Sequence, residues 1–139
     1  MRSVAEELAD EVVDWSVYSS VRFELGANFV RILSYFHEDG EKAVTRIEAA
    51  MHAKDAAAMI IPAHTMKSEA RQFGALPLAV VAEEIETAAR HAVEMQLFPD
   101  DILPQVAELR PLYRKTIDLL LERANPLQQR RAAGFGNRG

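Results

Sequence analysis

The sequence predicts an all-α protein, an antiparallel up-down four-helix bundle with an extra N-terminal helix. Apolar residues recur at intervals of three or four along nearly every segment, which is the helical period, and no segment alternates as a strand does. The 139 residues suffice for one domain with its own hydrophobic core. Cysteine is absent, so we expect a core without disulfides and no thiolate nucleophile or thiolate metal site.

The first half of the chain predicts three helices. One covers about residues 3–15 and caps the bundle, with an apolar stripe made of Val4, Leu8, Val12 and Trp15. A second covers about residues 19–37, and its apolar residues include Phe23, Val30, Leu33 and Phe36. Asp39-Gly40 then predicts a turn, and a short helix follows from Glu41 to about Lys54.

The second half predicts three more helices. Asp55 is the expected N-cap of a helix that runs through His64 and stops at Gly74, where glycine can adopt the left-handed conformation. Pro77 suits the first turn of the next helix, which continues to about Glu94. The last helix is expected over about residues 101–124, bent or stepped at Pro104 and Pro111 and ended by Asn125-Pro126.

These elements divide the chain into an N-terminal capping helix at 1–18, a helical bundle at 19–125 and a disordered basic tail at 126–139. The formal net charge of −5 disfavours binding to nucleic acid, which requires a basic surface, and favours protein partners. No stretch approaches the roughly 20 apolar residues of a membrane span, and the N-terminus lacks the apolar run of a signal peptide. We therefore expect a cytoplasmic protein.

His64 lies on a face of its helix that the core does not need. Residues three, four and seven positions later project from nearly the same side at 100° per residue, and these are Lys67, Ser68 and Arg71. Preceding residues add Ala57, Ile60 and Ile61 to that side. The opposite side forms a sufficient core stripe of Met59, Ala63, Met66, Ala70 and Phe73. We therefore expect an exposed His64, with apolar neighbours that a partner surface would cover.

The chemistry of this face suits phosphoryl transfer. An imidazole nitrogen is a competent nucleophile near neutral pH, and nearby cations can offset charge on phosphoryl oxygens. A surface histidine alone is a weak signal, and His37, His52 and His91 are interpreted as ordinary surface residues.

The residues around His64 also resemble a known family. Ala63-His64-Thr65-Met66-Lys67-Ser68, followed by Gln72-Phe73-Gly74-Ala75, is similar to the signature of histidine phosphotransfer (HPt) domains. That signature has lysine three, glycine four, an amide eight and glycine ten residues after the histidine. Lys67, Gln72 and Gly74 match, whereas Ser68 stands where the family usually has glycine. The resemblance extends over the helix order from about residue 19 to 124.

The resemblance implies roles for individual residues. It implies an exposed, phosphorylated His64 and an acceptor for the second ring nitrogen about 22 residues later, where Glu86 falls. Lys67, which shares the face of His64, is an expected phosphoryl contact. Glu83, one turn earlier, is the rival acceptor, and a third interpretation makes both carboxylates part of a solvated face. Ser68, Arg71 and Gln72, with the apolar residues before His64, are the expected phosphoryl contacts or docking residues.

The resulting hypothesis is a phosphorelay intermediate rather than an enzyme. A monomeric chain would accept a phosphoryl group on His64 from the receiver domain of a hybrid histidine kinase and pass it to the receiver domain of a response regulator. It would need no cofactor of its own, since the magnesium is expected on the partner receiver.

The chain has no room for an ATP-binding domain, which excludes an ordinary histidine kinase. Lys67 and Ser68 occupy the i+3 and i+4 places that a second metal ligand would need, which disfavours a metal site. The alternatives left are a non-catalytic helical adaptor for receiver domains and a dimeric phosphotransfer protein.

Overall fold

The structure is a computed structural model that describes residues 3–125. Its described part consists of helices and the connections between them, with no strand, as the sequence predicts. The α-helices are α1 (Val4–Val12), α2 (Trp15–Leu25), α3 (Phe29–His52), α4 (Ala57–Gln72), α5 (Leu76–Glu94) and α6 (Leu103–Ala124), and the 3-10 turns are η1 (Gly26–Asn28) and η2 (Asp100–Ile102). None of the described helices is long and apolar enough to cross a membrane. The basic tail expected at 126–139 lies outside the described residues.

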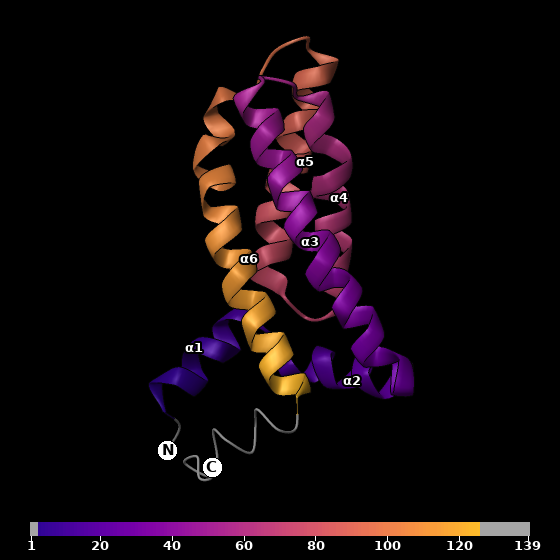
Figure 1. The fold of residues 1–139 in the computed structure, drawn as a ribbon. Helices are drawn as coiled ribbons and strands as arrows, with labels where there is room; N and C mark the ends of the chain where they lie inside the picture. The colour runs from indigo at the N-terminus through magenta and orange to yellow at the C-terminus, as the bar shows by residue number, and fades with distance from the viewer. Residues whose placement is uncertain (1–2, 126–139) are drawn as a thin grey trace.

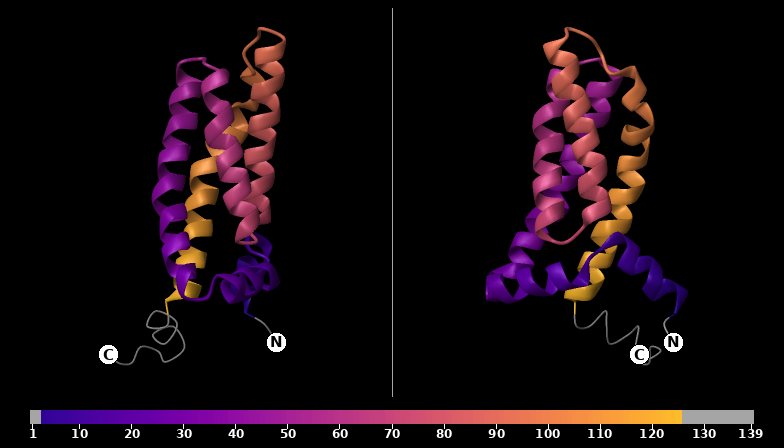
Figure 2. Two further views of the ribbon diagram at one scale, coloured as in Figure 1. Left: turned by 90° about the vertical axis from the view of Figure 1, so that its right-hand side faces the viewer. Right: turned by 180° about the vertical axis from the view of Figure 1, so that it is seen from behind.

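Four of these helices form an antiparallel up-down bundle. In Figure 1, α3, α4, α5 and α6 stand side by side and alternate in direction, while α1 and α2 lie across one end. Figure 2 gives the same arrangement from two other sides. The connections within the bundle are short, which favours antiparallel neighbours. The predicted bundle is therefore confirmed, with two short helices at its end in place of the single one expected.

The predicted boundaries in the first half of the chain are wrong in two places. The helix expected over 19–37 breaks at Gly26, whose φ of +54° ends α2, and the chain restarts as α3 at Phe29. Of the apolar residues of that expected helix, Leu33 and Phe36 are buried, whereas Phe23 and Val30 are 89% and 62% exposed. The turn expected at Asp39-Gly40 is absent, because α3 continues through both residues.

Gly40 lies inside α3 because α6 packs closely against it. The ring of Tyr113 covers Gly40, and the Tyr113 hydroxyl donates hydrogen bonds to the carbonyl oxygens of Phe36 at 3.2 Å and His37 at 2.8 Å. A Cβ atom on residue 40 would lie 2.6 Å from that hydroxyl oxygen and overlap the ring. This glycine therefore marks a close helix–helix contact, not a turn.

The predicted limits of the later helices agree better with the structure. The N-cap of α4 is Ala56, one residue later than the Asp55 predicted. The Asp55 Oδ1 atom nevertheless accepts a hydrogen bond from the Ala58 amide at 3.2 Å, which satisfies an N–H group in the first turn of α4. Gly74 has a φ of +81°, the left-handed value predicted for the end of this helix, and Pro77 lies in the first turn of α5. The last helix ends at Ala124 as expected, but η2 precedes it, and it continues through Pro111 without a break.

The core is continuous from the bundle to the N-terminal helices. The predicted core stripe of α4 is buried in full. Aromatic rings in contact connect α2, α3, the end of α4 and α6, in the order Tyr18, Phe29, Phe73, Phe36 and Tyr113. At the end of α4, the backbone amide of Asp14 donates a hydrogen bond to the Gly74 carbonyl oxygen at 2.8 Å. The connection between α1 and α2 is thus fixed to the end of the helix that carries His64.

Replacing Gly40 by alanine is expected to destabilise the protein by about 1–3 kcal/mol, because the new methyl group overlaps the Tyr113 ring. An exposed helical glycine would show the opposite sign, since alanine is the better helix former by about 1 kcal/mol. Urea unfolding of Gly40→Ala, Tyr113→Leu and the double variant measures the coupling. The double variant should cost less than the two single changes together, and additive costs would contradict the contact.

Glu69 on α4 should make stability depend on pH. Burial raises the pKa of this carboxyl to about 7, and the negative charge of Asp39 adds to the effect. The folded protein then binds more protons than the unfolded chain from about pH 4.5 to 7, so the free energy of unfolding falls as pH rises through this range. We expect Glu69→Gln to be more stable than the parent at pH 8, on the order of 1 kcal/mol, and not at pH 4. Denaturation curves at the two pH values check this, and an equal difference at both would contradict it.

Candidate functional site

His64 lies midway along α4, on the side of the helix away from the core. Half of its side-chain surface is exposed, while the alanine before it is fully buried. This is the orientation that the helical projection predicts. The imidazole ring is therefore open to solvent and is carried on a helix whose other side is fixed by packing.

Glu86 on α5 holds the imidazole from one side. His64 Nδ1 lies 2.9 Å from Glu86 Oε2, and the Glu86 side chain is only 6% exposed. With the carboxylate ionised, this hydrogen bond requires a proton on Nδ1 and leaves Nε2 as the nitrogen with a free electron pair. The predicted pairing of Glu86 with His64 is thus present in the structure.

The rival carboxylate does not contact the imidazole. Glu83 lies one turn earlier on α5, is about half exposed, and its Oε1 accepts from Arg71 Nη2 at 2.7 Å. Arg71, expected as a phosphoryl contact, is therefore paired with Glu83 at the edge of the site.

Lys67 is less available than the sequence predicts. Its side chain is 16% exposed, and its Nζ lies 2.7 Å from Glu86 Oε1 and 4.0 Å from Glu83 Oε1. The projection placed Lys67 beside His64 as a separate cation. In the structure both residues bind the two oxygens of the same carboxylate, because α5 packs against that side of α4.

Arg90 completes the surroundings of Glu86 and was not singled out in the sequence. Its Nε and Nη2 atoms each lie 2.9 Å from Glu86 Oε2, the oxygen that also binds His64. The spacing of four residues between Glu86 and Arg90 on one helix is a signal that could have identified it.

The buried carboxylate stays ionised because of these partners. Burial alone would raise the pKa of Glu86, but the hydrogen bonds from Lys67, His64 and Arg90 outweigh it and hold the pKa at about 2. Glu86 is therefore a fixed negative charge at neutral pH, in hydrogen-bond contact with the imidazole ring.

The remaining predicted residues extend the face along α4. Ser68 and Gln72 are exposed beyond His64, and Ala57 and Ile61 are exposed before it, with 69% of Ile61 open to solvent. Ile60 differs, because it is partly buried and packs against the core. Within residues 3–125, no three His, Cys, Asp or Glu side chains gather as a metal site would require.

One comparison with known proteins identifies a family for most of the chain. The family model described as the Hpt domain matches residues 31–125, which include α4, α5 and every residue placed around His64. No curated protein and no solved structure matches the chain.

Hpt domains carry a phosphoryl group on a histidine and interact with receiver domains. The family match covers more than half of the chain, and the fold and the exposed His64 are those that the resemblance implies. The protein therefore belongs to the Hpt domain family and takes part in histidine phosphotransfer in two-component systems.

Proposed function

We propose that this protein is a phosphorelay intermediate that accepts a phosphoryl group on His64 from a receiver-domain phosphoaspartate and passes it to a response regulator. The observation that carries the proposal is the contact between His64 Nδ1 and the ionised, buried Glu86 on an otherwise exposed imidazole. This contact selects the tautomer and the orientation that present Nε2 to a partner.

The transfer step balances in atoms and charge. The Nε2 electron pair attacks phosphorus, the bond from phosphorus to the aspartyl oxygen breaks, and the aspartate leaves as a carboxylate. The proton stays on Nδ1, so the ring becomes positive and Glu86 stabilises it across 2.9 Å. The reverse step uses the same groups, which suits a carrier that both receives and donates.

The cations around Glu86 would offset charge on the phosphoryl oxygens. Lys67 and Arg90 both pair with the carboxylate that holds Nδ1. A phosphoryl group on Nε2 would therefore gain from them only where their side chains exchange part of their contact with Glu86 for the phosphoryl oxygens. Further along α4, the Arg71 guanidinium, which pairs with Glu83, and the Ser68 hydroxyl would donate hydrogen bonds to the phosphoryl oxygens. These residues would position the phosphoryl group and offset the negative charge on its oxygens, without a cofactor on this chain. The magnesium of the reaction belongs to the receiver.

The apolar residues before His64 would form part of the docking surface. Ile61 and Ala57 are exposed although isoleucine and alanine are commonly buried, and Gln72 extends the exposed face at the other end. Serine at position 68, in place of the glycine typical of the family, still leaves a small side chain where a receiver would approach. We expect the chain to act as a monomer with receiver domains as its partners, one on a hybrid kinase and one on the response regulator.

The first prediction tests the phosphorylated residue. Incubation with a phosphorylated receiver domain and magnesium should give an acid-labile, base-stable phosphoramidate on the parent protein and none on His64→Gln. The matched controls are His37→Gln, His52→Gln and His91→Gln, which are exposed on other helices and should label like the parent. Labelling of His64→Gln would refute the proposal, and receiver binding without any labelling of the parent would favour the adaptor.

The second prediction tests Glu86 as a positioning residue. Loss of a hydrogen bond to a charged group, about 1.5–3 kcal/mol, should slow transfer about ten- to a hundredfold in Glu86→Ala. Glu86→Gln retains an acceptor and should recover part of the rate. Glu83→Ala on the same helix is the control and should have a smaller effect, since Glu83 does not contact the ring.

A readout at the ring separates positioning from folding. The ¹⁵N chemical shifts of His64 should indicate the Nδ1–H tautomer in the parent and a tautomer mixture in Glu86→Ala, with the helical circular dichroism unchanged. An unchanged tautomer together with an unchanged rate would mean that Glu86 serves only to pair Lys67 and Arg90.

A further inference from the structure

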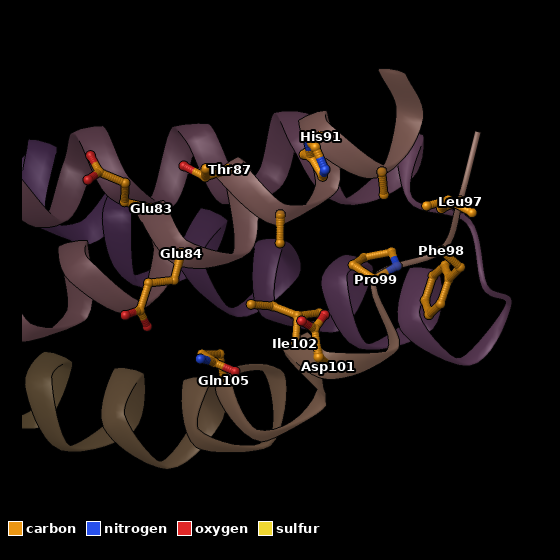
Figure 3. Close-up of a pocket in the computed structure, with 12 residues that line it drawn as sticks. Glu83, Glu84, Thr87, His91, Leu97, Phe98, Pro99, Asp101, Ile102 and Gln105 are labelled. Atoms are coloured by element: carbon orange, nitrogen blue, oxygen red, sulfur yellow. The ribbon is translucent and has the colours of Figure 1, made fainter. Parts of the chain in front are cut away.

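A groove lies between α5 and α6, at the end of the bundle where the two helices are connected. It has a volume of about 660 Å³, within the range of protein binding pockets, and its lining comes from α5, the connection that contains η2, and the start of α6 (Figure 3). Ala92, Pro99 and Ile102 are buried and form its floor. His64 and Lys67 do not line it, so the groove is separate from the site around His64.

The groove carries negative charge toward both ends. Glu83 and Glu84 lie at one end, and Asp101 lies toward the other (Figure 3). Glu83 pairs with Arg71, whereas within residues 3–125 neither Glu84 nor Asp101 forms an ion pair. A complementary ligand therefore carries positive charge at two places, one toward each end of the groove.

One cation lies close to the groove without lining it. Lys54 Nζ lies 5.6 Å from the ring centre of Phe98 and 3.4 Å from Asp100 Oδ1. No lysine or arginine belongs to the lining itself. The charge of Lys54 is therefore offset by Asp100, and Asp101 keeps its own charge for a ligand.

Apolar surface continues beyond the groove at this end of the bundle. More than half of the surface of Met95, Leu97 and Leu103 is open to solvent. Leu97 lines the groove, and Met95 and Leu103 lie just before and just after residues 97–102, which form its end. Exposed apolar side chains that adjoin a groove and are bordered by charged residues are typical of a protein interaction site.

The shape of the groove favours a helix as the ligand. Glu84, Ala88 and Ala92 follow one another at intervals of four along α5, so the groove extends for about 12 Å, or roughly two helical turns, along that helix. The two alanines have no side chain beyond Cβ, which lets the backbone of a third helix approach α5 closely. A helix in this place has apolar residues at i, i+3, i+4 and i+7 against the floor.

We propose that this groove docks an amphipathic helix of a partner protein, with apolar residues on one face and arginine or lysine toward both ends. Ala88 and Ala92 lie on a different side of α5 from Glu86, which holds His64, because they follow it by two and six residues on a helix of 3.6 residues per turn. The partner helix and a receiver domain over His64 can therefore bind at the same time. Docking in the groove does not depend on the proposed function.

A synthetic peptide tests the docking on the full ¹⁵N-labelled chain. The peptide has about 14 residues, with leucines at i, i+3, i+4 and i+7 and arginines toward both ends. We expect saturable shifts of the amide resonances of Ala88, Ala92, Leu97 and Gln105, while the resonance of Ile61 stays unchanged. Saturable shifts centred on Ile61, or no saturable shift up to millimolar peptide, would overturn the proposal.

Two control peptides test what the groove recognises. Glutamate in place of each arginine should weaken binding about tenfold or more, because like charges then meet at both ends of the groove. A proline in the middle of the peptide breaks its helix and should weaken binding by a similar factor. Equal affinity for the proline peptide would mean that the groove takes an extended ligand, which contradicts a docked helix.

Charge variants of the chain test the two acidic ends. Glu84→Lys with Asp101→Lys should weaken binding of the arginine peptide about tenfold or more. The matched control is Glu24→Lys with Glu38→Lys, which makes the same charge change on exposed residues of α2 and α3 that do not line the groove. An equal loss of affinity in both variants would mean general electrostatic attraction and would refute the specific groove.

Dilution of the protein alone tests whether the groove instead takes a second copy of this chain. We expect the resonances of Ala88 and Leu97 to stay unchanged on dilution from millimolar to micromolar concentration. Shifts of these resonances, together with faster sedimentation at the higher concentration, would show a second copy in the groove and would contradict a separate partner.

Discussion

The site depends on one buried charge. Glu86 is almost fully buried, and a carboxylate in that position is stable only if hydrogen bonds and opposite charges replace water. Three residues do so, two from α4 and one from α5. The constraint fixes the register of the two helices, because a shift of one residue would separate the carboxylate from His64 and Lys67 together. The imidazole is therefore oriented by the same interactions that allow Glu86 to be buried.

Much of this arrangement could be predicted from the sequence, and the failures have a physical cause. The 3.6-residue period placed His64 outward and Met66 inward on α4, since one helix determines its own faces. The pairing of Lys67 with Glu86 depends on how α5 lies against α4, which no single helix determines. The spacing of 22 residues that the resemblance implies identifies Glu86 as the partner of His64. Arg90 does not stand out in the sequence, because the need for a cation beside Glu86 becomes evident only from the burial of that carboxylate.

The main errors in the predicted helix boundaries occur at two glycines. Gly26 and Gly40 both occur within apolar periodic sequence, and the sequence does not distinguish a glycine that ends a helix from one that allows close packing. The prediction assigned the turn to Gly40, whereas Gly26 has the positive φ. The prediction that Gly74 ends a helix is confirmed. Two signals in the sequence support it, since Gly74 occupies a glycine position of the HPt signature and Pro77 marks the start of the next helix. Gly74 has a second role that the sequence did not suggest, since a Cβ there would lie 2.5 Å from the Asp14 carbonyl oxygen of the α1–α2 connection.

The contact between Gly40 and Tyr113 has a consequence for how this protein can diverge. The two residues are 73 positions apart, yet the ring occupies the space that any side chain at position 40 would need. A homologue with alanine or serine at position 40 must have a smaller residue at position 113 or a wider separation of α3 and α6. We therefore expect the two positions to covary among relatives, with an aromatic residue at 113 restricted to sequences that keep glycine at 40.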